Sequence, residues 1–223
     1  MTFQERIKLL WPFILGVVFT LGSLLVGKLI DPKITATELE LAAVFTSYVC
    51  VILCVTQKRA NYFWGIISTF LYCLLFWQSK LFALSVFNGV LVLSLIYGWF
   101  RWGPDGRPLQ VTDIKLNAYP LYAIFGVIVT LVMLIIFKML GEPLNHLDII
   151  TAVLSAVAQL MLDNKKRQTW VVWAVVNVMS LFLFYHQGIM LVFVQYIFFL
   201  INTMMGWFMW SRTMQKPSEQ LAI

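Results

Sequence analysis

The segment WVVWAVVN, residues 170–177, combines two tryptophans with an asparagine in an otherwise apolar stretch. Trp170, Trp173 and Asn177 are separated by three and four residues, so on an α-helix they lie along one stripe. An indole can stack on a flat or cationic ring, and a side-chain amide can both donate and accept hydrogen bonds. The segment therefore predicts a binding site for an aromatic compound that carries an amide group.

Other polar side chains stand inside apolar stretches elsewhere in the chain, and they could complete such a site. Amides suit ligand hydroxyls and carboxamides because they offer donors and acceptors together. A structural role in holding neighbouring helices together is an equal alternative for any single amide. The candidate binding residues are Trp64, Thr69, Tyr72, Asn88, Gln159, Trp173, Asn177, Gln195, Tyr196 and Asn202.

The sequence lacks the common patterns of catalysis and metal binding. It holds no HExxH, no GxSxG and no glycine-rich phosphate loop. Cys50 and Cys54 are one helical turn apart, but no histidine or carboxylate lies near them in sequence, so we expect packing residues. His146 and His186 stand near the ends of apolar runs. We expect no enzyme activity, no catalytic residue, no metal and no cofactor.

The elements that position these residues must lie in lipid. Of the 223 residues, 61% are hydrophobic and 12% are charged, whereas a soluble domain carries roughly a quarter charged residues. The apolar residues form runs of roughly 20 residues, which are typical of membrane-spanning helices. The sequence predicts an all-α integral membrane protein with eight transmembrane helices, over residues 12–30, 39–56, 62–78, 81–100, 119–140, 147–163, 169–185 and 189–210.

Basic residues gather in alternate connections between these runs. Lys and Arg are enriched in cytoplasmic loops, so both termini are predicted to be cytoplasmic. Such short clusters do not form a continuous basic face, and the net charge of +6 therefore does not indicate nucleic-acid binding. The basic connections contain Arg6, Lys8, Lys58, Arg59, Arg101, Arg107, Lys115, Lys165, Lys166, Arg167, Arg212 and Lys216. The opposite connections contain Asp31, Glu38, Glu40, Glu142 and Asp148.

Two runs end in near copies of one motif, IYGWFRW at residues 96–102 and MMGWFMW at residues 204–210. The same offset of 108 residues pairs Lys58-Arg59 with Lys166-Arg167 and Asn88 with Tyr196. Each copy holds three runs, and a single run between the copies restores the chain direction. This pattern predicts two parallel repeats related by an axis along the membrane normal, a construction found in many transporters.

In both motifs the glycine permits close helix contact. The motif tryptophans, and Trp170, are expected to anchor the helices at the cytoplasmic membrane interface.

The repeat divides the chain into five predicted parts. These are an extra N-terminal transmembrane helix (1–35), a first three-helix repeat (36–102), a linker with a connecting transmembrane helix (103–142), a second three-helix repeat (143–212) and a cytoplasmic tail (213–223).

Charged residues are missing from the centre of every run. Proton relays and sodium sites usually use buried carboxylates. Transport by such a chain is therefore expected to proceed without ion coupling. A cationic aromatic compound could still be held by the faces of the tryptophans.

Together, IYGWFRW, MMGWFMW, the segment WVVWAVVNVMSLFLFYHQG (170–188) and the order of runs resemble the PnuC-type nicotinamide riboside transporters of bacteria. The resemblance covers about residues 39–210, and the first helix is similar to an extra N-terminal crossing of some members. It implies a fold similar to the SWEET sugar transporters, a homotrimer in the bacterial inner membrane, and facilitated diffusion. It also implies a functional link to a cytoplasmic kinase that traps the substrate by phosphorylation.

Nicotinamide riboside suits the residues found above, because it has a cationic ring, a carboxamide and ribose hydroxyls. Trp173 and Asn177 are then expected to hold the nicotinamide, and Asn88 and Gln195 the ribose. Thiamine or another aromatic vitamin is the alternative substrate. A membrane receptor or assembly protein without transport activity is the alternative of another class.

Overall fold

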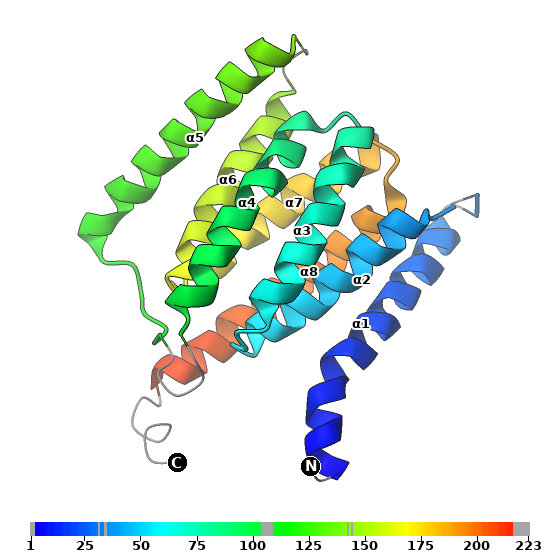
Figure 1. Ribbon diagram of the computed structural model, residues 1–223, viewed down its shortest axis with the longest axis vertical. Coiled ribbons are helices and arrows are strands. Elements are labelled where there is room, and N and C mark those ends of the chain that lie inside the picture. The colour runs from blue at the N-terminus through cyan, green and yellow to red at the C-terminus, as the bar shows by residue number, and fades with distance from the viewer. Residues whose placement is uncertain are drawn as a thin grey trace.

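A computed structural model describes residues 3–30, 32–33, 35–103, 109–141, 143 and 145–215. Asp31, Arg107, Glu142 and Lys216 lie outside the described residues, as do the side chains of Arg6 and Lys8. The described chain is almost entirely helical (Figure 1). Its elements are α1 (Phe3–Ile30), α2 (Glu38–Val55), α3 (Asn61–Gln78), α4 (Phe82–Arg101), the short 3₁₀ helix η1 (Leu116–Ala118), α5 (Tyr119–Leu140), α6 (His146–Asp163), α7 (Thr169–His186) and α8 (Met190–Gln215).

Local sequence signals set several helix ends. Thr37 and Glu40 form a capping box at the start of α2, with the Glu40 amide donating to the Thr37 hydroxyl at 3.1 Å. Asn145 caps α6 by accepting from the Asp148 amide at 3.2 Å. Gly141 ends α5 in the left-handed conformation with a φ of 68°, which glycine adopts without strain.

Each of the eight predicted runs coincides with one α-helix. Seven of these helices are long and apolar enough to cross a membrane. The exception is α3, which has 18 residues like α2 but begins with Asn61 and ends with Gln78. The prediction of an all-helical, multi-pass membrane protein is confirmed, although composition alone marks seven spans and not eight.

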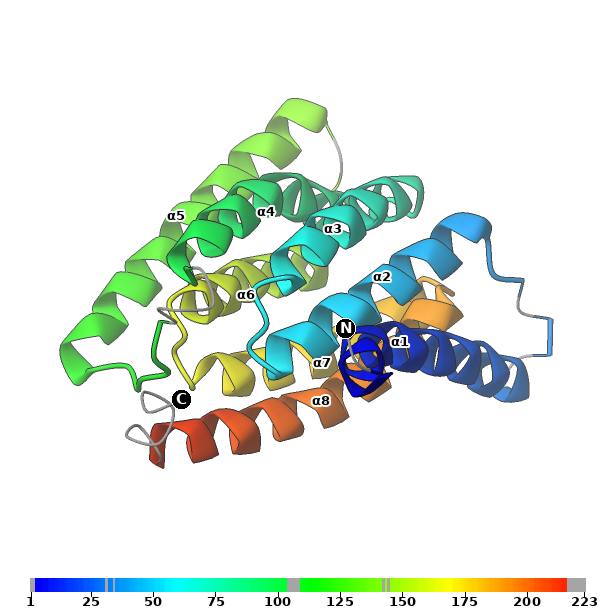
Figure 2. The same ribbon diagram turned by 60° about the horizontal axis from the view of Figure 1, so that its bottom comes forward.

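Six helices form the centre of the bundle and two lie at its sides. Within the two units, α2, α3 and α4 pack in sequence order, as do α6, α7 and α8. The units meet where α4 packs on α6 and α2 packs on α8. The outer helices are α1, which packs on α2 and α8, and α5, which packs mainly on α6 (Figures 1 and 2).

The two glycines of the repeated motifs lie against aromatic rings at equivalent positions. A Cβ atom on Gly98 would lie 2.1 Å from the Tyr62 ring, and one on Gly206 would lie 2.4 Å from the Trp170 ring. Tyr62 and Trp170 are themselves 108 residues apart. Glycine is therefore required by close approach at both places, as the motif suggested.

The motif tryptophans correct the expectation of interfacial anchoring. Trp102 and Trp210 are only 2% and 0% exposed, and Trp170 is 4% exposed. Trp102 packs on Tyr62 with ring centroids 5.1 Å apart, and Trp210 packs on Trp170 at 5.2 Å. Their rings fill the space where the two units meet and so cannot face lipid head groups. We call Tyr62, Trp102, Trp170 and Trp210 the aromatic cluster.

Trp99 and Trp207, the other pair of motif tryptophans, are half-buried beside basic residues. Arg59 lies over the Trp99 ring at 4.0 Å, and Arg167 lies over the Trp207 ring at 4.5 Å. These cation–π pairs again follow the 108-residue offset. The axis that would relate the two units, and the domain boundaries, stay predictions.

Alanine at Gly98 or Gly206 should destabilise the protein by about 1–3 kcal/mol, because a methyl group would overlap a buried ring. Gly22→Ala is the matched control, since nothing lies within 4 Å of a Cβ atom there and alanine favours the helix. Thermal unfolding in detergent, followed by tryptophan fluorescence, measures the difference. Equal unfolding temperatures for all three variants would mean that neither motif glycine is needed for close approach.

Candidate functional site

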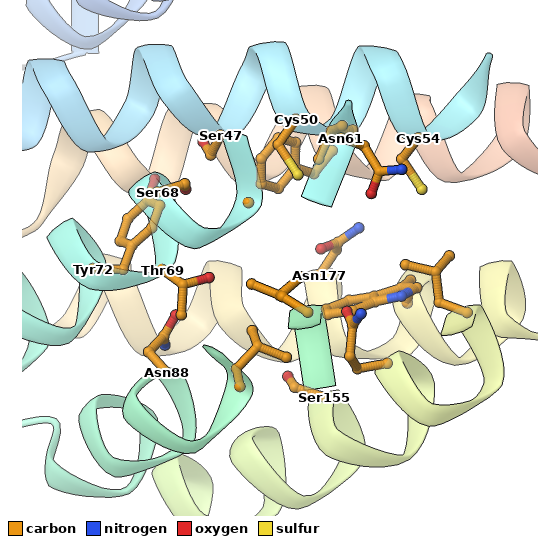
Figure 3. A pocket seen from close by; sticks show the side chains of 18 of the residues that line it. Ser47, Cys50, Cys54, Asn61, Ser68, Thr69, Tyr72, Asn88, Ser155 and Asn177 are labelled. Atoms are coloured by element: carbon orange, nitrogen blue, oxygen red, sulfur yellow. The ribbon is translucent and has the colours of Figure 1, made fainter. Parts of the chain in front are cut away.

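A cavity lies between the two units, and its walls come from α2, α3, α4, α6, α7 and α8 (Figure 3). Neither α1 nor α5 contributes a residue to it. Aromatic rings form part of the wall, among them Phe76, Phe87, Trp170, Trp173 and Phe199. The remaining polar and thiol-bearing lining residues are Ser47, Cys50, Cys54, Asn61, Ser68, Thr69, Tyr72, Asn88, Ser155, Gln159, Asn177, Tyr196, Asn202 and Thr203.

Most of the candidate residues from the sequence meet in this cavity. The eight that line it are Thr69, Tyr72, Asn88, Gln159, Trp173, Asn177, Tyr196 and Asn202. Trp64 and Gln195 do not. The cavity therefore unites side chains from both units that are up to 133 positions apart in the chain.

Asn177 and Asn202 are the two lining amides without a hydrogen bond to any described residue, and Asn177 is the more deeply buried of the two. It is 2% exposed, yet it hydrogen-bonds to none of the residues that the structure describes. Figure 3 places it between Tyr72, Thr69 and Asn88 on one side and Asn61 and Cys54 on the other. A buried amide without a partner is costly in a membrane, so Asn177 is suited to pair with a ligand.

Three other amides of the wall are oriented by the protein, and in each of them the NH₂ group donates to a protein acceptor. Asn88 donates to the Leu84 carbonyl at 2.7 Å, and Asn61 donates to the Lys58 carbonyl at 2.7 Å. Gln159 donates to the Asp163 carboxylate at 2.8 Å. In each case the NH₂ group is used within the protein, which leaves the carbonyl oxygen as an acceptor for a ligand.

Gln195 supports the wall from behind and does not project into the cavity, contrary to the sequence expectation. It is fully buried, and its Nε2 donates to the Val44 carbonyl at 3.2 Å and to the Ser47 hydroxyl. Its Oε1 accepts from the Tyr72 hydroxyl. Gln195 thereby orients two lining residues, and the Tyr72 oxygen remains available as an acceptor.

Trp64 lies on another face of α3, away from the cavity. Its ring packs edge-on against Phe13 of α1 and Phe45 of α2, with centroids 5.2 Å and 6.4 Å apart. An indole on an apolar helix can contact either lipid, another helix or a ligand, and its position in the sequence does not distinguish these.

Sequence reasoning missed several lining residues. Cys50 and Cys54 line the cavity, and their spacing of one turn already implied a shared face. Trp170 lines it as well, although anchoring was expected. Asn61 has no comparable signal, because it follows basic residues at the start of α3 and resembles a loop residue.

Two buried aspartates lie at the ends of α6, and the sequence did not single them out because charged residues were considered only at the centres of the apolar runs. Asp148 is 0% exposed and accepts from the amides of Ala83 and Leu84 at 2.8 Å and 3.0 Å, at the start of α4. Asp163 is 0% exposed and accepts from the hydroxyls of Tyr62, at 3.1 Å, and Ser94. Both carboxylates tie α6 to the first unit.

A buried lysine lies next to the aromatic cluster. The Lys165 ammonium is 4.4 Å above the Trp102 ring and donates to the Gln57 side chain at 3.2 Å. Its residue is 1% exposed, and this burial lowers the pKa of the ammonium to about 8. Lys165 does not line the cavity, so its charge interacts with side chains of the protein and not with a ligand in the cavity.

The arrangement can bind and orient a ligand but offers no chemistry. Among the described residues, none with an ionised side chain lines the cavity. The wall combines aromatic faces, a free amide and several acceptor oxygens. Such a wall favours an aromatic or cationic compound rich in hydrogen-bond donors.

Comparison with known proteins agrees with this description. The family model described as "Nicotinamide mononucleotide transporter" matches residues 37–212. The "Nicotinamide riboside transporter PnuC" of Escherichia coli (strain K12) is 25% identical over 202 residues, covering 77% of this chain and 84% of its own. The protein of the same name from Neisseria mucosa is 26% identical over 193 residues, covering 80% and 73%.

A solved structure shares the fold. The "Crystal structure of the Vitamin B3 transporter PnuC" has a TM-score of 0.73 and 23% identity, and the likeness covers 97% of this chain and 94% of the other. The helical architecture expected from the sequence is therefore that of a known membrane transporter. Since the family model spans most of its length, this chain belongs to the nicotinamide mononucleotide transporter family and is a PnuC-type membrane transporter, not an enzyme.

Proposed function

We propose that the protein carries nicotinamide riboside into the cell across the bacterial inner membrane, by exposing its central cavity to either side in turn. The observation that carries this proposal is the free amide of Asn177, placed one turn after Trp173 in a cavity of acceptor oxygens. The indole would stack on the pyridinium ring, and the amide would pair with the carboxamide. The names of the relatives support the same substrate.

The ribose hydroxyls would be bound by oxygens from both units. Asn88 and Tyr72 present acceptors toward the cavity, and Asn202 forms no hydrogen bond with any described residue. Thr69, Gln159 and Tyr196 complete the proposed set, whereas Gln195 acts by holding Tyr72 and Ser47. Trp64 is no longer part of the set, because it packs against α1.

The cavity favours the riboside over the mononucleotide. A phosphate carries up to two negative charges and needs Lys, Arg or several amide donors to be buried. None of the described residues that line the cavity is basic, and its oriented amides present oxygens. A phosphate would therefore be buried without a positive charge to balance it, which is unfavourable.

Transport without ion coupling is part of the proposal. No described lining residue is ionised, and the oxygens of the buried Asp163 already accept from three side chains. Phosphorylation by a cytoplasmic kinase would keep the substrate inside. A homotrimer, surrounded by lipid, is proposed from the family resemblance.

We also propose that both termini are cytoplasmic. In Figure 1, α1 begins and α8 ends at the same end of the bundle. The connections at that end contain Lys58, Arg59, Lys166 and Arg167, and there Arg59 lies over Trp99 and Arg167 over Trp207. The excess of positive charge on one side supports the assignment of that side to the cytoplasm.

Labelling of single cysteines in whole cells tests the orientation. In a background without Cys50, Cys54 and Cys73, a cysteine at Lys58 should resist a membrane-impermeant thiol reagent until the cells are opened. A cysteine at Lys80, in the connection at the opposite end of α3, should be labelled in intact cells. The reverse pattern would overturn the orientation. Labelling of a cysteine at Lys166 in intact cells would also overturn the parallel-repeat prediction.

Asn177→Ala and Asn88→Ala should each weaken binding of nicotinamide riboside roughly five- to tenfold, because each removes a hydrogen bond worth about 1 kcal/mol or more. Trp173→Ala should cost at least as much through lost stacking. Val175→Ala is the matched control, since Val175 lies on the same helix and is 48% exposed on the bundle surface. Titration calorimetry in detergent provides the dissociation constants.

Three results would change the proposal. Parent-like affinity in all three site variants would mean that these side chains only hold helices together. Much tighter binding of thiamine by the parent would keep the site but change the substrate. Failure of every vitamin tested, both in binding and in liposome flux, would favour a receptor or assembly protein.

Flux into liposomes tests the energetics. Without a kinase inside, labelled nicotinamide riboside should equilibrate to equal concentrations on both sides, because nothing couples it to another gradient. Imposed proton and sodium gradients should leave the final level unchanged when the membrane potential is held at zero, as a cationic substrate requires. Accumulation above the outside concentration under either gradient would show that ion coupling exists.

A further inference from the structure

Asp163, the last residue of α6, joins three helices through its side chain. One carboxylate oxygen accepts from Tyr62 of α3 at 3.1 Å and from Gln159 of α6 at 2.8 Å. The other oxygen accepts from Ser94 of α4. The residue is 0% exposed and forms no salt bridge with any residue that the structure describes. Asp163 does not line the cavity, but Gln159 does.

This contact determines which end of the Gln159 amide faces the cavity. An ionised carboxylate only accepts hydrogen bonds, so the NH₂ group of Gln159 must be the end turned toward Asp163. The Gln159 oxygen accepts from no described residue and is not among the described buried atoms that lack a partner. It is therefore open to the cavity and available to a donor of the ligand.

The backbone next to Gln159 lies beside the start of α7, one turn before Trp173 and two turns before Asn177. The hydroxyl of Thr169, at the start of α7, donates to the carbonyl of Ala158 at 2.7 Å. This bond sets the neighbour of Gln159 beside the first turn of α7, one turn before Trp173. From there a glutamine side chain can reach a group attached to a ring on the Trp173 face.

We propose that Asp163 is a positioning residue for substrate recognition: it fixes the Gln159 amide so that the oxygen accepts from the carboxamide N–H of the ligand. The inference rests on the proposed function, because it needs nicotinamide riboside in this cavity. Asp163 acts without touching the ligand. A neutral side chain at position 163 would accept either end of the Gln159 amide, and the cavity would lose its preference for a donor at this point.

The test compares two ligands that differ by one donor group. Nicotinamide riboside has an NH₂ group on its carbonyl, and the methyl-ketone analogue has a CH₃ group there with the same charge and nearly the same shape. The parent should bind nicotinamide riboside about tenfold more tightly than the ketone, since one or two hydrogen bonds separate them. The readout is the dissociation constant of the ketone divided by that of nicotinamide riboside, both from titration calorimetry.

In Asp163→Asn the ratio should fall about fivefold. The Gln159 amide can then turn, so that its oxygen no longer faces the carboxamide N–H of the ligand. Loss of the negative charge affects both cationic ligands equally and cancels in the ratio. Gln159→Leu should lower the ratio to a similar extent. In the double variant the two changes should not add, since Asp163 acts through Gln159.

Asp148→Asn is the matched control, because it makes the same change at another fully buried aspartate that binds only backbone amides. Its ratio should equal that of the parent. If Asp163→Asn does not fold, Gln159→Leu decides alone: an unchanged ratio means that the Gln159 oxygen does not meet the carboxamide N–H.

The proposal and the function beneath it fail in different ways. A parent protein that binds neither ligand contradicts the proposed substrate. A parent that prefers nicotinamide riboside but keeps this preference in Asp163→Asn contradicts the positioning role alone. Additive effects in the double variant would also overturn it, because Asp163 would then act independently of Gln159.

Discussion

Polar groups inside a membrane cannot bond to water, so each must find a partner in the protein or in a ligand. This constraint explains the buried contacts of the bundle. Thr20 and Ser155 donate to carbonyls of their own helices at 2.7 Å, and Gln195 is satisfied by three neighbours. A few buried groups lack a partner among the described residues, such as the Trp170 indole N–H and the Ser180 hydroxyl. The side-chain amides of Asn177 and Asn202, which line the cavity, also bond to no described residue. A group left open in this way is best understood as one that a ligand completes.

The same constraint explains why both charged ends of α6 are tied to the first unit. Asp148 accepts from the first amides of α4, which a helix leaves without intrahelical partners. At the other end of α6, Asp163 collects hydroxyls from α3 and α4. Each contact satisfies a buried acid and joins the two units beside the cavity.

Positions 108 residues apart line the cavity in pairs, but their side chains differ. Gly65 corresponds to Trp173, Thr69 to Asn177, and Asn88 to Tyr196, and all six are lining residues. One unit has no side chain where the other places an indole, so the cavity lining is asymmetric. A compound with an aromatic amide at one end and a sugar at the other requires this asymmetry. Divergence within similar units thus supports a ligand whose two ends differ.

The sequence by itself determined the helices, the lipid environment and eight of the residues that line the cavity. The helices begin and end within one residue of the predicted runs, except that α1 begins nine residues earlier and α8 ends five residues later. The agreement arises because length and hydropathy are local properties. The stripe of Trp173 and Asn177 follows from helical spacing alone. Only the tertiary structure decided that Gln195 lies behind the wall, that Trp64 faces α1, and that Trp102 and Trp210 are buried. The physical reason is that lipid is as apolar as a protein core, so hydropathy cannot tell which face of a membrane helix meets another helix.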